Sequence, residues 1–220
     1  MSGRSVRRGL LVAVEGIDGA GKSTFVRALV RRLRARGHSV RSAREPLRSE
    51  LGRAGALANA TDPWRAALWF TLDRAFARPH LERALADCDL LIQDRSFYST
   101  LAYQGSRLPP SGRRLLEAFE RAVALAPDVV LFLDVDPRTA LARLDRRGSA
   151  RAPLERRAVL ERTATAYRRL AKRPGWCRID GRAPPAESVA RATHRLEARL
   201  RRPRRPRSEA NLPNRRARPR

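Results

Sequence analysis

The chain has little of several things that define other protein classes. Among its 220 residues there are two cysteines, Cys88 and Cys177, and neither has a second Cys or a His at metal-ligand spacing. This excludes a disulfide framework and a cysteine-based metal cluster, and it indicates a reducing compartment. No run approaches the length of a membrane span, and the apolar run Leu10–Val14 is too short for a signal-peptide core. We therefore expect a soluble, cytoplasmic protein with no membrane partner.

Acidic residues and lysines are also scarce. The chain has 48 Lys+Arg against 22 Asp+Glu, which gives a formal net charge of +26, and Lys22 and Lys172 are its two lysines. Such a charge favours anionic partners, but it bears on association and not on fold or reaction. Because charge alone cannot read bases, we expect no nucleic-acid partner, with the basic C-terminal tail as the one open case.

Short β-branched or leucine-rich runs alternate with longer Arg/Ala/Leu segments along the chain. This rhythm predicts an α/β fold, a three-layer αβα sandwich in which a parallel sheet is covered by helices on both faces. We expect five strands, at Leu10–Val14, Ser39–Ala43, Leu90–Gln93, Val129–Leu133 and Arg178–Ile179. We expect helices at Thr24–Arg36, Pro63–Ala86, Ser111–Leu125, Pro137–Arg147, Leu154–Ala171 and Pro185–Leu200.

The composition predicts one domain and two terminal segments. Residues 9–200 are long enough to form one well-buried domain, and residues 1–8 form a short basic extension before it. Residues 201–220 contain nine arginines, four prolines and one glutamate, with Leu212 as their only large apolar residue. Such a segment cannot bury a core, so we expect a disordered basic tail. An arm that binds nucleic acid or a membrane surface is the alternative.

The segment Gly16–Ser23, Gly-Ile-Asp-Gly-Ala-Gly-Lys-Ser, follows an apolar run and opens a helical pattern. In that context glycines let backbone N–H groups point at phosphates, and the helix N-terminus adds a positive dipole. Lys22 would neutralise the β- and γ-phosphate oxygens, and the Ser23 hydroxyl would hold Mg²⁺. The sequence therefore predicts a P-loop for ATP or GTP with Mg²⁺, formed by Gly16, Ile17, Asp18, Gly19, Ala20, Gly21, Lys22, Ser23 and Thr24.

A second cluster of polar and aromatic side chains, Asp94–Gln104, directly follows the expected strand Leu90–Gln93. The carboxyl ends of strands form the ligand crevice of a doubly wound sheet, so Asp94 and Arg95 are expected to face the same space as the P-loop. Arg95 is suited to clamp an acceptor phosphate in a bidentate contact, and Asp94 would orient it or the hydrated Mg²⁺. A surface salt bridge that caps a helix is the structural alternative.

Four separated segments of the chain resemble the thymidylate kinase family. They are Val14–Thr24, Arg44-Glu45-Pro46, Phe70-x3-Arg74-Ala75, and Asp94-Arg95 followed by Ser99-Thr100-x-Ala102-Tyr103-Gln104-Gly105, in the family's order and spacing. The resemblance continues to about Leu200. It implies an enzyme that phosphorylates dTMP to dTDP with ATP, by in-line transfer, in the supply of dTTP. It also implies a homodimer packed through helices.

The resemblance assigns the base of the acceptor to a helix. Phe70 would stack on the thymine ring, and Arg74, four residues later on the same helix face, would hydrogen-bond its carbonyl edge. Thr100 would approach the base as well. For Phe70 alone, a core aromatic beside Trp69 is the alternative.

The sugar and phosphate of the acceptor are assigned to other segments. By the resemblance, Tyr103 would close over the sugar and disfavour a ribose 2′-hydroxyl, with Gln104 nearby. Asp18 would lie near the sugar 3′-hydroxyl or the metal. The implied acceptor site comprises Asp18, Glu45, Pro46, Phe70, Arg74, Arg95, Thr100, Tyr103 and Gln104.

The catalytic charges are expected from the P-loop, the second cluster and a lid. A monophosphate acceptor is largely ionised at neutral pH, so positioning and charge neutralisation must do most of the catalysis. Residues 143–157 have the place and composition of the family's mobile lid. Some members carry a catalytic arginine in the P-loop where this chain has Gly19, so we expect the lid to supply it, with Arg143 structural. The implied catalytic set is Lys22, Asp94, Arg95 and Arg147 or Arg151, with Ser23 and Asp94 at the metal.

The chain departs from the family pattern at three places. Ser96 stands where an aromatic residue is usual, Leu47-Arg48-Ser49 replaces a Gly-Gly-Thr, and the lid lacks the usual Asp-Arg pair before its glutamate. A related deoxynucleotide or deoxynucleoside kinase with another acceptor is therefore the alternative. A non-catalytic nucleotide- or nucleic-acid-binding protein is the rival from another class.

Overall fold

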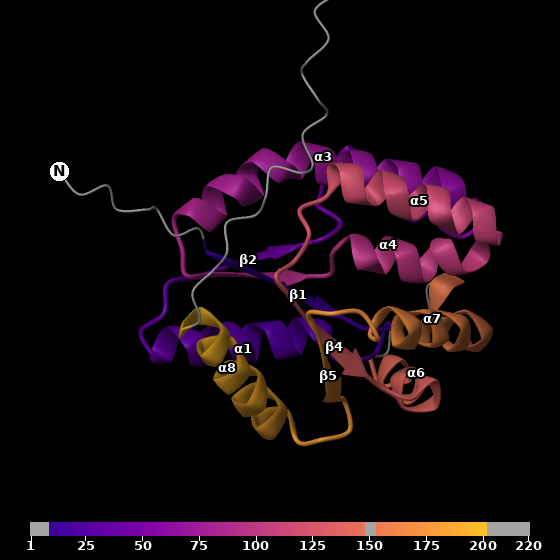
Figure 1. The fold of residues 1–220 in the computed structure, drawn as a ribbon. Coiled ribbons are helices and arrows are strands. Elements are labelled where there is room, and N and C mark those ends of the chain that lie inside the picture. The colour runs from indigo at the N-terminus through magenta and orange to yellow at the C-terminus, as the bar shows by residue number, and fades with distance from the viewer. Residues whose placement is uncertain (1–8, 148–152, 202–220) are drawn as a thin grey trace, which may run out of the picture.

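The computed structural model describes residues 9–147 and 153–201, and within these ranges the chain forms three layers (Figure 1). The middle layer is a five-stranded parallel sheet with strand order β2-β3-β1-β4-β5. Its strands are β1 (Leu10–Glu15), β2 (Val40–Arg44), β3 (Leu90–Asp94), β4 (Val129–Asp134) and β5 (Trp176–Asp180). The expected α/β class and five-stranded sheet are confirmed.

The three inner strands are buried along their whole length. Every residue of β1, β3 and β4 is buried, as parallel strands between two helical layers require. The edge strands β2 and β5 instead mix buried and exposed positions. The inner strands thus form a rigid floor, and functional side chains at their carboxyl ends are held by a packed core.

The helices cover both faces of the sheet. They are α1 (Lys22–Ala35), α2 (Glu50–Ala58), α3 (Pro63–Ala86), α4 (Phe97–Tyr103), α5 (Pro110–Val123), α6 (Pro137–Asp145), α7 (Arg157–Leu170) and α8 (Pro185–Arg201). Helices α1 and α8 pack together on one face, while α3, α4, α5 and α7 lie on the other (Figure 1). None of the helices in the described ranges is long and apolar enough to cross a membrane.

The strand order places a topological switch between β1 and β3. The chain leaves β1 through α1 and crosses over β3 to reach β2, whereas it leaves β3 through α4 and α5 and crosses over β1 to reach β4. The two connections therefore run in opposite directions from neighbouring strands. Such a point opens a crevice at the carboxyl ends of the strands, and here Val14 of β1 pairs with Asp94 of β3.

The structure adds elements that the sequence did not predict. Helices α2 and α4 were not expected, β5 is longer than the expected Arg178–Ile179, and α6 ends at Asp145 instead of Arg147. Helix α2 contains Gly52 and Gly55, which have low helix propensity, and α4 is only seven residues long. The terminal segments 1–8 and 202–220 lie outside the described residues, so the expected basic extension and disordered tail stay predictions.

Candidate active site

The P-loop joins the end of β1 to the start of α1, as the motif predicts. Gly16, Gly19 and Gly21 have φ angles of 149°, 80° and 89°, a region that side chains disfavour. At Gly19 a Cβ atom would also lie 2.4 Å from the carbonyl oxygen of Ala140 in α6. An arginine therefore cannot occupy position 19 in this conformation, which agrees with the expectation that any further catalytic arginine comes from elsewhere.

Lys22 folds back onto the P-loop. Its Nζ donates hydrogen bonds to the carbonyl oxygens of Gly16 (2.9 Å) and Ile17 (2.8 Å) and lies 3.8 Å from an Asp18 carboxylate oxygen. Burial, and then the charge of Arg95, lower the pKa of Lys22 to about 8, although nearby carboxylates oppose this. The ammonium is thus held in the concave side of the loop, where a polyphosphate would be its natural counter-charge.

Ser23 and Asp94 meet at the entrance of the switch crevice. The Ser23 hydroxyl donates a 2.6 Å hydrogen bond to Asp94 Oδ2. Both are hard oxygen donors, which suit Mg²⁺. Within the described ranges no group of three or more His, Cys, Asp or Glu side chains could hold a metal ion. This arrangement fits Mg²⁺, which takes one or two protein oxygens and completes its shell with phosphates and water.

Arg95 lies between the P-loop and α4. Its guanidinium forms an ion pair with Asp18, donates a 3.2 Å hydrogen bond to Ser99 Oγ, and lies over the Tyr103 ring at 5.5 Å from the centroid. Tyr103 Oη in turn accepts from the Asp18 backbone N–H (2.8 Å) and donates to its carboxylate (3.0 Å). Burial alone would raise the pKa of Asp18, but Arg95, Lys22 and Tyr103 lower it to about 2.

A cavity of about 200 Å³ opens beside this cluster. Its lining comes mainly from α3, α4 and the loops that follow β2 and β3. Its lining residues are Asp18, Glu45, Pro46, Ala56, Asn59, Phe70, Asp73, Arg74, Arg95, Ser96, Ser99, Thr100, Tyr103, Gln104 and Leu154. All nine residues of the predicted acceptor site therefore meet in one cavity, next to the P-loop.

Arg74 lines the same cavity and lies between two buried carboxylates. It donates to Glu45 through Nε (2.9 Å) and Nη2 (2.7 Å), to Glu120 through Nη1 (2.6 Å), and to Thr100 Oγ1 (3.3 Å). Burial would lower its pKa, but the two glutamates outweigh this and raise it. These contacts use four of the five guanidinium N–H groups, which leaves one Nη1–H for a ligand.

Phe70 lines the cavity with its ring against α2. The contact is possible because position 55 is a glycine: a Cβ at Gly55 would lie 2.6 Å from Phe70 Cε1. Since Phe70 borders the cavity and Trp69 does not, the reading of Phe70 as a simple core aromatic is not favoured. Gly55 thus sets where this ring lies.

The unusual Leu47-Arg48-Ser49 segment is anchored by Asp73. The Asp73 carboxylate accepts from the Leu47 backbone N–H (2.8 Å) and from the Ser49 hydroxyl, while Ser49 Oγ accepts from the Gly52 N–H (2.9 Å) as the N-cap of α2. A Cβ at Gly52 would lie 2.4 Å from the Leu47 carbonyl oxygen. This loop therefore keeps a fixed course without the glycines usual in the family.

The lid, residues 143–157, is described at its two ends. Arg147 forms an ion pair with Glu155 (2.9 Å) and is not among the residues lining the cavity. Arg151 lies outside the described residues. Arg143, expected to be structural, donates to the carbonyl oxygen of Gly181 (2.9 Å) and so joins α6 to the loop after β5. A catalytic role for Arg147 or Arg151 remains a prediction.

Several residues at the site were missed from the sequence. Glu15 and Glu120 are fully buried carboxylates, and Asp73 and Gly55 shape the acceptor loop and the Phe70 contact. Glu120 had a usable signal, because it lies four residues after buried Leu116 on an otherwise apolar helix stripe. A charge at such a position must be paired or hydrogen-bonded.

Comparisons with known proteins agree with this geometry. A sequence model of the thymidylate kinase family matches residues 14–192. The chain belongs to the thymidylate kinase family. A thymidylate kinase from Xanthomonas euvesicatoria pv. vesicatoria (strain 85-10) is 38% identical over 193 residues, covering 86% of this chain and 83% of the relative. One from Synechococcus sp. (strain WH7803) is 35% identical over 197 residues, covering 82% and 91%.

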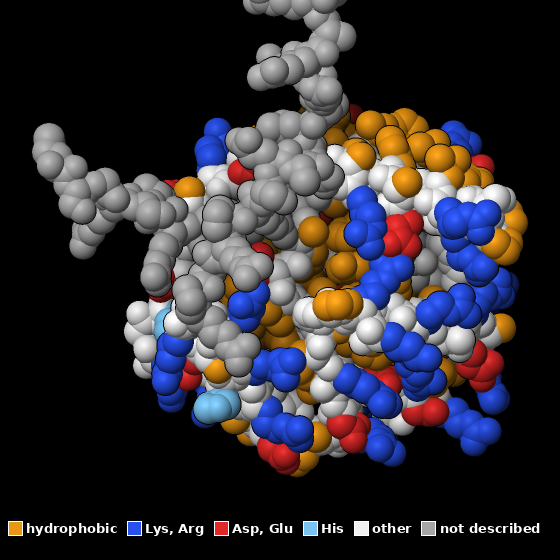
Figure 2. Space-filling view, in the orientation of Figure 1, with side chains coloured by type: hydrophobic (Ala, Val, Ile, Leu, Met, Phe, Trp, Pro, Cys, Tyr) orange, Lys and Arg blue, Asp and Glu red, His pale blue; other side chains and the backbone are white. Residues whose placement is uncertain are grey.

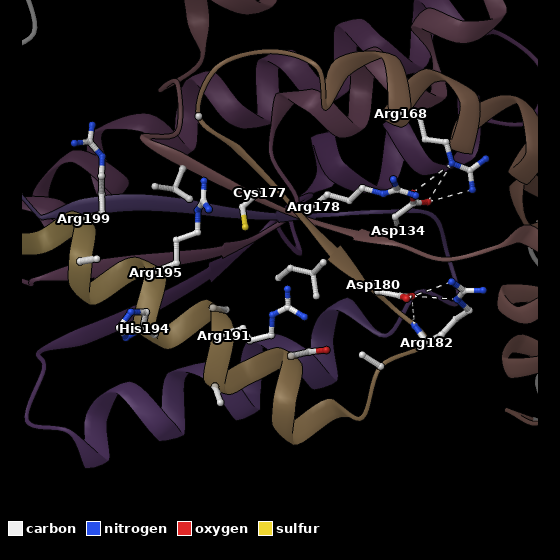
Figure 3. Close-up of a pocket in the computed structure, with 18 of the residues that line it drawn as sticks. Asp134, Arg168, Cys177, Arg178, Asp180, Arg182, Arg191, His194, Arg195 and Arg199 are labelled. Carbon is white, nitrogen blue, oxygen red and sulfur yellow. Dashed lines mark hydrogen bonds and ion pairs between the residues drawn. The ribbon is translucent and has the colours of Figure 1, made fainter.

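A second and larger cavity, of about 1450 Å³, runs along the edge strand β5 beside α8 (Figure 3). It shares no lining residue with the cavity described above. Asp134 pairs there with both Arg168 (3.1 Å) and Arg178 (2.6 Å), and Asp180 pairs with Arg182 (3.2 Å). Charged side chains of this kind protect an edge strand from pairing with other chains, so this groove has a structural explanation.

Proposed function

We propose that the chain transfers the γ-phosphoryl group of ATP to dTMP, giving ADP and dTDP. The observation that carries the proposal is the single cavity that Arg95 and the P-loop residue Asp18 line together with Phe70 and Arg74. Such a cavity is suited to a nucleoside monophosphate with its phosphate toward the loop. Membership of the thymidylate kinase family supports dTMP as that acceptor.

The donor half uses Lys22, Ser23 and the P-loop backbone. On binding of ATP, Lys22 would exchange the carbonyl oxygens of Gly16 and Ile17 for phosphate oxygens. Ser23 and Asp94 are the residues that would hold Mg²⁺. When bound, the ion would neutralise charge on the β- and γ-phosphates.

The acceptor half needs no strong base. The dTMP phosphate is largely ionised at neutral pH, so Arg95 has only to hold its oxygens in line with the γ-phosphorus. Tyr103 and Asp18 are hydrogen-bonded to each other and would lie beside the sugar. Phe70 would stack on the base, and the remaining N–H of Arg74 would donate to a base carbonyl.

Removing single charges tests this assignment. We expect Lys22→Ala and Arg95→Ala each to lower kcat/KM for dTMP about 10³-fold or more, since each removes a charge that meets the transferring or accepting phosphate. Arg191→Ala, on the exposed face of α8, is the matched control and should stay within about twofold. Steady-state kinetics with coupled ADP detection measures all three. Full activity in Arg95→Ala would contradict the role assigned to Arg95, and a wild-type chain without turnover would support the non-catalytic rival.

We also propose that the enzyme is a homodimer through α3 and α5. Leu68, Leu72 and Phe76 of α3 and Leu115 and Phe119 of α5 are exposed, with Phe76 at 71% and Leu115 at 64%. Figure 2 shows apolar side chains gathered over these helices. A contiguous apolar face of this kind marks an interface, and a second copy would cover it with the same face.

A further inference from the structure

Glu15, the last residue of β1, is a fully buried carboxylate that accepts four hydrogen bonds. Ser96 donates to Oε1 through both its backbone N–H (2.7 Å) and its hydroxyl (2.7 Å). Ser99 Oγ (2.7 Å) and Tyr167 Oη (2.8 Å) donate to Oε2. Burying a carboxylate costs free energy. For Glu15 the four hydrogen bonds offset this cost, and within the described residues the carboxylate forms no ion pair.

Val14 and Glu15, at the end of β1, hydrogen-bond the backbone of Arg95 and of the next residue. Arg95 is the one non-glycine residue with positive φ (73°) in the described ranges, a conformation that persists only where the surroundings enforce it. Its own N–H donates to the Val14 carbonyl oxygen (3.1 Å), and the next N–H, that of Ser96, donates to Glu15. The backbone of Arg95 is therefore fixed from both sides by the end of β1.

Glu15 is also linked to the side chain of Arg95, through Ser99. Ser99 Oγ, which donates to Glu15, also accepts from Arg95 Nη1 (3.2 Å). Tyr167 lies within 2.9 Å of the same Ser99 oxygen and belongs to α7, the helix that follows the lid. One carboxylate thus joins the strand that leads into the P-loop, the helix that carries the acceptor site, and the helix behind the lid.

We propose that Glu15 is a positioning residue that holds Arg95 in the orientation required for the acceptor phosphate. The inference rests on the proposed function, because it takes Arg95 as the phosphate clamp. Ser96 has a role in this network: its hydroxyl and N–H both serve Glu15, which gives a reason for a serine where the family usually has an aromatic residue.

A comparison of two ligands tests the proposal, because dTMP and thymidine differ by the phosphate that Arg95 holds. In Glu15→Gln one acceptor oxygen becomes an N–H donor that faces groups donating to it, so the hydrogen bonds to Ser96 or to Ser99 and Tyr167 must rearrange. Titration calorimetry on the full chain should show dTMP binding weakened about tenfold and thymidine binding changed less than about twofold. Glu15→Gln on an Arg95→Ala background should weaken dTMP binding no further.

Glu197→Gln is the matched control, since Glu197 is a buried carboxylate that pairs with Arg36 and His38 away from the cavity. It should leave both ligands within about twofold. If Glu15→Gln does not fold, Ser99→Ala, which removes only the side-chain route, should weaken dTMP binding and spare thymidine. Equal weakening of both ligands, or of neither, would overturn the proposal. A wild-type protein that binds dTMP no more tightly than thymidine would instead overturn the proposed function.

Discussion

The surroundings of Lys22 predict how ATP binding depends on pH. Its ammonium is buried, and burial followed by the charge of Arg95 lowers its pKa to about 8, against the opposing charges of Asp18, Asp94 and Glu15. In the free enzyme it therefore loses its proton as the pH rises through about 8. Bound ATP brings several negative charges to the same place, which favours the charged lysine and raises its pKa. Binding above pH 8 must then take up a proton.

The size of the change in ATP affinity follows from this linkage between proton binding and ATP binding. With a free-enzyme pKa of about 8 and a lysine that stays charged when ATP is bound, the apparent Kd for ATP rises roughly tenfold between pH 7 and pH 9, which is about 1.4 kcal/mol. The affinity must fall, and not rise, with increasing pH, because the neutral lysine present at high pH is the form that binds phosphate poorly. Proton uptake should be roughly half a proton per ATP at pH 8 and close to one at pH 9.

Titration calorimetry in two buffers of different ionisation enthalpy measures both quantities. Lys22→Arg is the control, because arginine stays charged throughout this range, and its ATP affinity should vary little with pH. An affinity of the wild-type enzyme that does not change from pH 7 to pH 9, with no proton uptake, would refute the reasoning.

Three further predictions concern the cavity, the apolar face and the tail. Gly55→Ala forces the Phe70 ring to move and should raise KM for dTMP about tenfold with kcat within about threefold; an unchanged KM in steady-state kinetics would argue against base stacking by Phe70. Phe76→Asp should give monomers in sedimentation analysis, while Arg191→Asp should not; dimers in both would place the interface elsewhere. Deleting residues 202–220 should leave kcat/KM within about twofold, and a larger loss would assign the tail a role.

The parts of the fold predicted best are those encoded by local pattern. The runs that became β1, β3 and β4 are apolar except at their carboxyl ends, and the Gly16–Ser23 spacing is typical of a tight phosphate-binding turn. Helices α2 and α4 were missed because their length and glycine content give weak periodicity, and tertiary packing stabilises them instead.

The sequence predicted which residues line the acceptor site, but not the contacts that these residues make with one another. The sequence placed Phe70 and Arg74 on one helix face, but it could not show that Glu120, from α5, shares Arg74 with Glu45. Nor could it show that Glu15 supports Arg95. Such contacts join residues between 29 and 84 positions apart, and no short-range pattern encodes them.

The most direct test of the central claim is a steady-state comparison of acceptors with ATP and Mg²⁺. We expect kcat/KM for dTMP to exceed that for dUMP by at least about tenfold, because dUMP lacks a methyl group that an apolar cavity would bury, and to exceed that for dCMP by more. Thymidine, which has no phosphate for Arg95, should not turn over measurably. A preference for dUMP, dCMP or thymidine over dTMP would contradict the account.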